Sequence, residues 1–227
     1  MIATIQIGER LDEACVRTLR DGIAAAVAEK ARALVIEGAP ERFCLGMDFA
    51  TLDIIGQPAR LRGFAGMMHA LLMIPIPTLS VIDGPALGGG LGVAAACDFV
   101  LASDRARFGL PEALYGLAPA IIRPALLGRL SPQQLRMLVV TCHSRSAEEA
   151  RALGLVDEVV PHGELAHARN RIVRQLRRAS GDTVAAMRRW DAVALARALA
   201  AGVEETGAAL ARADVRAAIS SEDPSWA

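Results

Sequence analysis

Three consecutive glycines stand at the point of the sequence best suited to hold a reacting group. Gly88-Gly89-Gly90 follows an apolar run at 78–82 and leads into a second run of small and aliphatic residues that ends at Cys97. Glycine lets backbone amides approach a ligand because no Cβ intervenes, and the first turn of a helix leaves its amides without intrahelical acceptors. We therefore expect this turn to stabilise developing negative charge on a small group, such as a thioester carbonyl oxygen.

Two other functions of glycine-rich turns are excluded by the neighbouring residues. A phosphate-binding loop has Lys and then Ser or Thr after its last glycine, whereas Leu91-Gly92 stands here. A dinucleotide-binding turn has the spacing G-x-G-x-x-G and an acidic residue about twenty positions later, whereas these glycines are contiguous. The turn is therefore not expected to bind a nucleotide in either of these ways.

Glu112 is the candidate acid or base near this turn. It follows Pro111, and this pair is also a common start for an exposed helix, so the pair alone does not establish catalysis. A glutamate in an apolar pocket has a raised pKa, which suits a group that must both accept and donate a proton.

The elements around these residues alternate between strand and helix. Short apolar or alternating runs predict strands at 3–7, 33–37, 78–82, 99–102, 107–110 and 155–160. Helical spacing predicts helices at 11–28, 60–73 and 91–97, and a largely helical region from about residue 164. Ser131 and Ser146 are expected to cap helices, and Gly154 to end one. A β-α-β beginning predicts parallel strands.

Composition excludes several classes of protein. The 227 residues carry 25 basic and 25 acidic side chains, and 53% are hydrophobic, so we expect a substantial core and no nucleic-acid partner. No apolar run reaches membrane-spanning length, and the N-terminus lacks the pattern of a signal peptide. The four cysteines are widely spaced and are expected to be free thiols. We expect a soluble, cytoplasmic protein that binds no membrane.

Five stretches resemble elements of the crotonase (enoyl-CoA hydratase/isomerase) superfamily. The resemblance covers nearly the whole chain, in the order and spacing of that family. The matching elements are F-x-x-G-x-D at 43–48, D-G-x-A-x-G-G-G at 83–90 (where the family has Asn first), C-D at 97–98, F-x-x-P-E at 108–112 and A-x-E-A-x-x-x-G-L-V-D-x-V-V at 147–160.

The resemblance implies an α/β fold of the ClpP/crotonase type, a spiral of β-β-α repeats. It implies a core at residues 1–160 and a helical region at 161–227 that forms a homotrimer or a hexamer. The implied substrate is an acyl thioester of CoA or of acyl carrier protein, with no metal and no cofactor beyond that carrier.

The resemblance also assigns roles to residues. The backbone amides of Met47 and Gly89 match the two donors of the family's oxyanion hole, and Glu112 matches one of its two catalytic carboxylates. The other carboxylate would stand at Gly92. Substrate-binding roles are implied for Leu45, Gly88, His69, Tyr115 and Leu117.

A single glutamate leaves three functions open. The stretch at 111–126 resembles the branch that contains polyketide β-branching dehydratases and methylglutaconyl-CoA hydratases, which favours dehydration of a 3-hydroxy-3-methylglutaryl-type thioester. A 3,2-enoyl-CoA isomerase also works with one glutamate. The third possibility is a catalytically weak homologue that binds an acyl thioester or a protein partner.

Overall fold

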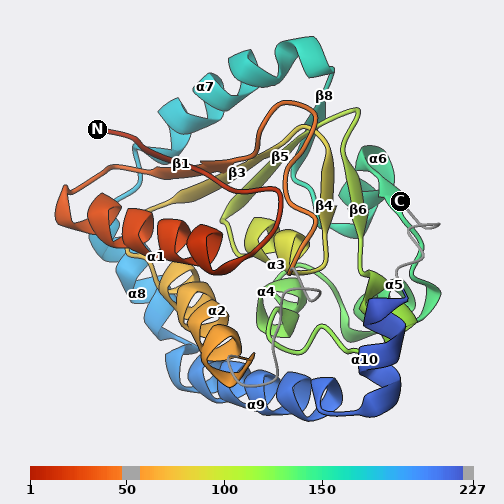
Figure 1. The fold of residues 1–227 in the computed structure, drawn as a ribbon. Helices are drawn as coiled ribbons and strands as arrows, with labels where there is room; N and C mark the ends of the chain where they lie inside the picture. Colours follow the sequence, from red (N-terminus) through yellow and green to blue (C-terminus); the bar gives the residue numbers. More distant parts are fainter. Residues whose placement is uncertain (48–56, 222–227) are drawn as a thin grey trace.

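The computed structural model describes residues 1–47 and 57–221, and a five-stranded parallel sheet lies at its centre. The strand order is β1-β2-β3-β5-β8, and every neighbouring pair is parallel (Figure 1), which confirms the predicted pairing. The strands are β1 (Ala3–Gln6), β2 (Leu34–Glu37), β3 (Thr78–Ile82), β5 (Phe99–Ser103) and β8 (Glu158–Val160).

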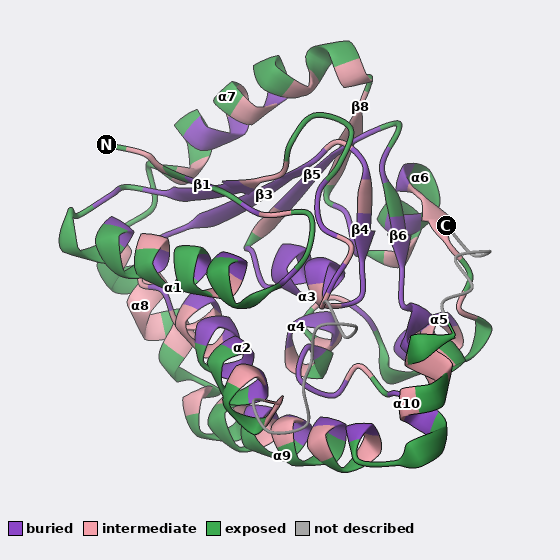
Figure 2. Cartoon of the chain, viewed as in Figure 1, coloured by how far each residue is buried: buried purple, intermediate pink, exposed green. Residues whose placement is uncertain are grey.

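Helices cover both faces of this sheet, as a parallel sheet requires. Helix α7 (Leu165–Leu176) packs on one face, where Ile172 contacts a cluster that includes Val35 and Leu101. On the other face lie α1 (Glu13–Ala28), α2 (Gln57–Leu72) and α3 (Gly89–Ala95). Figure 2 shows the strands buried between these layers, and every residue of β2 and β3 except Glu37 is buried.

A second, smaller sheet stands beside the first, with the order β4-β6-β7. It contains β4 (Pro85–Leu87), β6 (Arg107–Gly109) and β7 (Arg145–Ser146). The local sequence pattern predicts no strand at residues 85–87. They form a strand because β6 pairs with one of their edges and Cys44 with the other, contacts that are distant in sequence.

The remaining helices all follow the glycine turn along the chain. They are η1 (Pro111–Tyr115), α4 (Arg123–Leu127), α5 (Pro132–Thr141), α6 (Ala147–Leu153), η2 (His162–Glu164), α8 (Gly181–Arg189), α9 (Ala192–Leu210) and α10 (Ala213–Ser220). Helix α9 packs along α2, and α10 packs against η1. Within the described ranges no helix combines the length and apolarity needed to cross a membrane. The division of the chain at residue 160 stays a prediction.

The three predicted helix caps are confirmed, and the predicted starts of four elements are wrong by two or three residues, those of α1 and α2 among them. Ser131 and Ser146 both form complete capping boxes, and Gly154 ends α6 in the left-handed conformation. Helix α3 begins at Gly89 rather than at residue 91. Strand β8 begins at Glu158 rather than at residue 155, because the amide of Leu155 donates to Ala150 O and closes the end of α6.

Arg129 joins the end of α3 to the central sheet. Its guanidinium donates to the carbonyls of Ala95 and Cys97 and, at 3.0 Å, to Asp157, which itself accepts the amide of Val100 on β5. The side chain of Arg129 is only 10% exposed. It therefore satisfies carbonyls that the end of a short helix would otherwise leave unpaired.

Replacing Arg129 with Met should lower the free energy of unfolding by about 3 kcal/mol, since it leaves the partners of a buried charge without a donor. Arg212→Met is the matched control, because the pair that Arg212 makes with Asp214 is largely exposed and should contribute less than about 1 kcal/mol. Urea denaturation measures both variants. Equal losses of unfolding free energy in Arg129→Met and Arg212→Met would contradict the assigned role of Arg129.

Candidate active site

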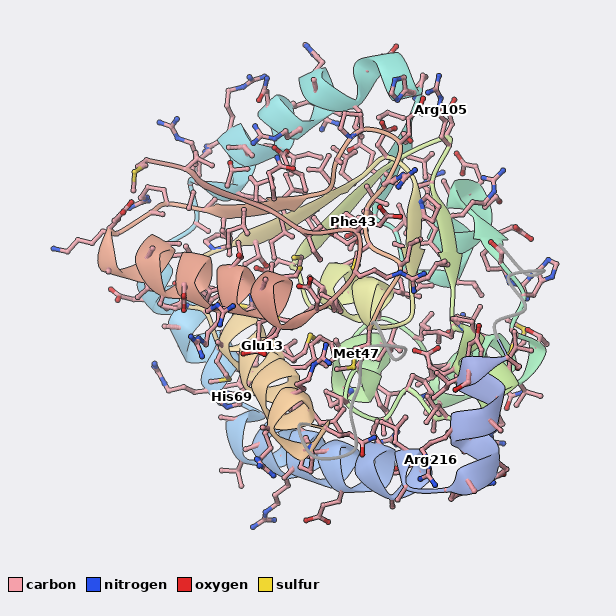
Figure 3. All side chains as sticks on the ribbon, viewed as in Figure 1. Glu13, Phe43, Met47, His69, Arg105 and Arg216 are labelled. Atoms are coloured by element: carbon pink, nitrogen blue, oxygen red, sulfur yellow. The ribbon has the colours of Figure 1, made fainter. Side chains whose placement is uncertain are left out.

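The first part of the site is the segment 43–47, which turns at Gly46 just before Met47. Leu45 donates its amide to Glu9 O at 2.8 Å, and Gly46 O accepts the amide of Leu11 at 2.9 Å. On its other side, Cys44 pairs with Ala86 of β4. Figure 3 labels Phe43 and Met47 near the two ends of this segment. The segment is thus fixed between two neighbours before it reaches Met47.

The second part is the glycine turn at the start of α3, which touches the first part through backbone atoms. A Cβ added to Gly90 would lie 2.3 Å from Cys44 O, and one added to Gly46 would lie 3.0 Å from Leu87 O and 3.2 Å from Gly89 N. Gly46 also has a φ of +90° and Gly88 a φ of +50°, values that favour glycine. Only glycine at these positions allows the two turns to pack this closely.

This contact brings the amides of Met47 and Gly89 together. A Cβ on Gly89 would be 3.7 Å from Met47 N. In the part of the chain that the structure describes, neither amide donates to a backbone acceptor. The same Cβ would meet Leu11 and Phe64 at 2.8 and 3.4 Å, so apolar side chains flank the pair. Two amides in such surroundings can hold a developing oxyanion.

Glu112 lies on the other side of the glycine turn. The amide of Gly88 donates to Gly109 O at 2.9 Å, which ties the turn to the end of β6 three residues before Glu112. A Cβ on Gly88 would be 3.0 Å from Glu112 Oε1. The amides and the carboxyl group therefore belong to one site.

The surroundings of Glu112 favour its neutral form. Its side chain is only 8% exposed, and Oε2 has no hydrogen-bond partner among the described residues. Burial raises the pKa of Glu112 to about 7, because a charged carboxylate is poorly solvated there. A carboxyl group with a pKa near neutrality can accept a proton and return it, which is the requirement for a general acid–base.

Gly92, the position where a second carboxylate would stand, has no room for a side chain. A Cβ added there would lie 2.2 Å from Ile122 Cγ2 and 2.5 Å from Ile122 Cβ. Ile122 is 3% exposed and belongs to the hydrophobic core. An apolar side chain thus occupies this space, and Glu112 is the one carboxyl group that the structure brings to the glycine turn in the described residues.

The other predicted substrate-binding residues lie at different distances from this centre. Leu45 adjoins Gly46 and is half-buried, and Leu117 is buried with its amide donating to Glu112 O at 3.0 Å. Tyr115 lies three residues after Glu112 on the 3₁₀ helix η1, where side chains three apart share one side. These placements leave the binding roles of all three as predictions.

His69 is not brought to the amide pair by any contact in the described residues. It follows Phe64, the α2 residue that reaches Gly89, by five positions, which is about 140° around the helix axis. Its role in substrate binding stays a prediction. Asp48, the last residue of the F-x-x-G-x-D element, lies outside the described residues.

Two features of this region have no local signal in the sequence. Ile122 was not considered, since its contact with Gly92 joins positions thirty residues apart. His162, to which no role was assigned, places Nδ1 2.7 Å from Asp83, the first residue of the glycine-rich stretch. Although partial burial acts in the opposite direction, hydrogen bonds from His162 and Ser103 lower the pKa of Asp83. This pair fixes the end of β3 and lies outside the site itself.

Comparison with known proteins agrees with the fold. The family model for enoyl-CoA hydratase/isomerase matches residues 2–217. A crystal structure of an enoyl-CoA hydratase from Mycobacterium avium superposes with a TM-score of 0.84 at 26% identity, covering 100% of this chain and 94% of that one. The chain therefore belongs to the enoyl-CoA hydratase/isomerase family, and its predicted crotonase-type α/β fold is confirmed.

Two curated relatives are similar over part of their length. The enoyl-CoA isomerase/hydratase fer4 of Mycosarcoma maydis is 34% identical over 138 residues, which are 57% of this chain and 49% of that protein. The bacillaene synthase dehydratase PksH of Bacillus subtilis is 32% identical over 158 residues, 66% of this chain and 59% of that protein. The matches thus span about half to three-fifths of these relatives.

The pKa of Glu112 predicts how stability depends on pH. Because the folded state holds this proton more tightly than the unfolded state, stability falls as pH rises from the unfolded pKa, near 4.5, through about 7. The Glu112→Gln variant has no ionisable group at this position and therefore does not lose this stability as the pH rises. At about 1.4 kcal/mol per pKa unit, the variant should gain about 3 kcal/mol over the wild type between pH 4 and pH 8.

Urea denaturation of both proteins across this pH range measures the gain. A Glu112→Gln difference that does not change between pH 4 and pH 8 would show that the carboxyl group is ionised as easily in the folded protein as in the unfolded one.

Proposed function

We propose that this protein is an acyl-thioester dehydratase that removes water from a 3-hydroxy-3-methylglutaryl-type thioester through an enolate. The observation that carries the proposal is one buried carboxyl group beside two amides that donate to no backbone acceptor among the described residues, with no space for a second carboxylate at Gly92. The similarity to the dehydratase PksH supports the same reaction class.

The reaction can be written with the residues of this site alone. The amides of Met47 and Gly89 hold the thioester oxygen, and the ionised Glu112 accepts the C2 proton. As the enolate collapses, the C2–C3 double bond forms and the C3–O bond breaks. The protonated Glu112 then gives its proton to the departing hydroxide, which leaves as water and returns Glu112 to its ionised form.

The properties of Glu112 fit both of these proton transfers. A carboxylate with an ordinary pKa would be a weaker base toward carbon, and a permanently neutral carboxylic acid could not start the reaction. A pKa of about 7 makes both forms available near neutral pH. Each amide donor is expected to contribute about 3 kcal/mol of transition-state stabilisation.

The carrier of the acyl group is CoA or acyl carrier protein. Both present the thioester on the same phosphopantetheine arm, and the chemistry proposed here acts only on the acyl end. It requires no metal and no further cofactor. Assembly as a homotrimer or hexamer, a polyketide β-branching pathway and a cytoplasmic location stay predictions.

Isomerisation of a 3-enoyl thioester is the second candidate, because one carboxyl group can also carry a proton between two carbons. The relative fer4, named as an isomerase/hydratase, keeps this candidate open. Offering 3-hydroxy-3-methylglutaryl and 3-enoyl thioesters in parallel separates the two, since dehydration lowers the product mass by one water and isomerisation leaves it unchanged.

Glu112→Gln should reduce dehydration by about 10²–10⁴-fold, the range for loss of a general acid–base, while the affinity for the thioester is retained. Steady-state kinetics and calorimetric binding measure the two effects. Glu148→Gln is the matched control, because Glu148 is exposed on α6, and its turnover should equal that of the wild type.

Retained turnover in Glu112→Gln would overturn the assignment of the base. Conversion of the 3-enoyl thioester alone would replace dehydration with isomerisation. Tight binding of the thioesters without turnover by the wild type would instead support a homologue that only binds.

A further inference from the structure

Ile122 lies against Gly92 more closely than any side chain at position 92 could tolerate. The ideal Cβ position at Gly92 is 2.2 Å from Ile122 Cγ2, 2.5 Å from its Cβ and 3.3 Å from its Cδ1. Carbon atoms that are not bonded pack at about 3.5–4.0 Å. The first atom of any side chain at position 92 is therefore excluded by Ile122.

Rotation of the Ile122 side chain cannot relieve this overlap. The atom at 2.5 Å is Ile122 Cβ, whose position is set by the backbone and does not change with χ1. Ile122 also precedes α4 as its N-cap residue and is buried in the core, where displacement is costly. Space at position 92 opens only when Ile122 loses its Cβ, as in Ile122→Gly.

The blocked position lies close to the catalytic turn. The amide of Gly92 donates to Gly88 O at 3.0 Å, so Gly92 stands one helical turn after the residue that faces Glu112, about 5.4 Å along the axis. A glutamate side chain at position 92 could span this distance. Without Ile122, this short helix could present a second carboxyl group to the same bound thioester.

We propose that Ile122 is the specificity-determining residue of this site. Its side chain fills the space that a second carboxyl group, carried by residue 92, would need, and the site is therefore limited to reactions that one carboxyl group can catalyse. The inference rests on the proposed thioester chemistry and deepens it. Glu112 must move the proton at C2 and the proton at the C3 oxygen by itself, because among the described residues no second carboxylate shares these transfers.

The reaction that this restriction disfavours is hydration of an unbranched 2-enoyl thioester. In that reaction the water oxygen bonds to C3 while the C2–C3 π bond breaks, one carboxylate takes a proton from the water, and a carboxylic acid gives a proton to C2. Two carboxyl groups divide these transfers between them. Gly92→Glu combined with Ile122→Gly would supply the second group and the space for it.

A thermal-denaturation cycle tests the packing without relying on activity. Gly92→Ala should lower Tm strongly in the wild type, and its effect should be less than half as large in the Ile122→Gly background. Ile121→Gly is the matched control: Ile121 is also buried, but it lies against Gly202. In the Ile121→Gly background, Gly92→Ala should lower Tm by as much as it does in the wild type. Equal losses in all three backgrounds would overturn the proposal.

Kinetics with crotonyl-CoA tests the consequence for the reaction. The Gly92→Glu/Ile122→Gly variant should hydrate crotonyl-CoA at least tenfold faster than both the wild type and Gly92→Gln/Ile122→Gly, which has the same shape without the acid. Circular dichroism selects folded variants for this comparison. Equal rates for the Glu and Gln variants would overturn the proposal.

The two hypotheses fail in different experiments. A wild type that dehydrates the 3-hydroxy-3-methylglutaryl thioester, together with a Gly92→Glu/Ile122→Gly variant that gains no hydratase activity over its Gln counterpart, would reject the role of Ile122 alone. A wild type that turns over neither this thioester nor a 3-enoyl thioester would reject the proposed function.

Discussion

The site depends on the direct contact of two backbone turns, one ending at Met47 and the other beginning α3. Gly46, Gly88 and Gly90 make this contact possible because a Cβ on Gly46 or Gly90 would meet backbone atoms of the opposite turn and one on Gly88 would meet Glu112. Close packing of backbone brings the amides of Met47 and Gly89 close together, and neither donates to a backbone acceptor among the described residues. The surrounding strands hold this arrangement before any substrate is present, and such preorganisation is what makes amide donors effective in catalysis.

The second sheet links the amides to the acid–base group. β4 leads into the glycine turn, β6 leads toward Glu112, and their parallel pairing places Leu87 opposite Gly109. The amide of Gly88 continues this pairing to Gly109 O. The distance between the oxyanion donors and Glu112 is therefore set by the register of a strand pair, which is more rigid than a pair of loops.

Much of the fold could be predicted from local sequence, since the signals involved act over a few residues. Apolar runs predicted all five strands of the central sheet, and Ser131, Ser146 and Gly154 marked helix ends through contacts within one turn. Strand β4 could not be found this way, because its partners come from β6 and from Cys44. Resemblance to a family, rather than local pattern, identified Met47, Gly89 and Glu112, and the structure brings these three together.

The contact between Ile122 and Gly92 illustrates the limit of such reasoning. The sequence shows that Gly92 lacks a carboxylate, yet a glycine in a helix is equally compatible with empty space, water or a packed side chain. Only the tertiary structure distinguishes these, and it shows the buried carbon atoms of Ile122. The apolar character of this side of the site thus depends on two residues: Gly92, which has no side chain, and Ile122, which fills the space beside it.

An apolar site also fits the proposal that Glu112 acts alone. A basic side chain or a hydrogen-bond donor beside Oε2 would stabilise the carboxylate and lower its pKa, which would weaken it as a base toward carbon. Burial without such a partner raises the pKa of Glu112, and above neutral pH it lowers the free energy of unfolding by about 3 kcal/mol. This is a large share of the 5–15 kcal/mol that typically stabilises a folded domain. The dense core around the site offsets this cost. A fold that buries one carboxyl group in this way gains an acid–base that changes its protonation state near neutral pH, and a second ionised carboxylate nearby would raise the pKa further and add to the cost of burial.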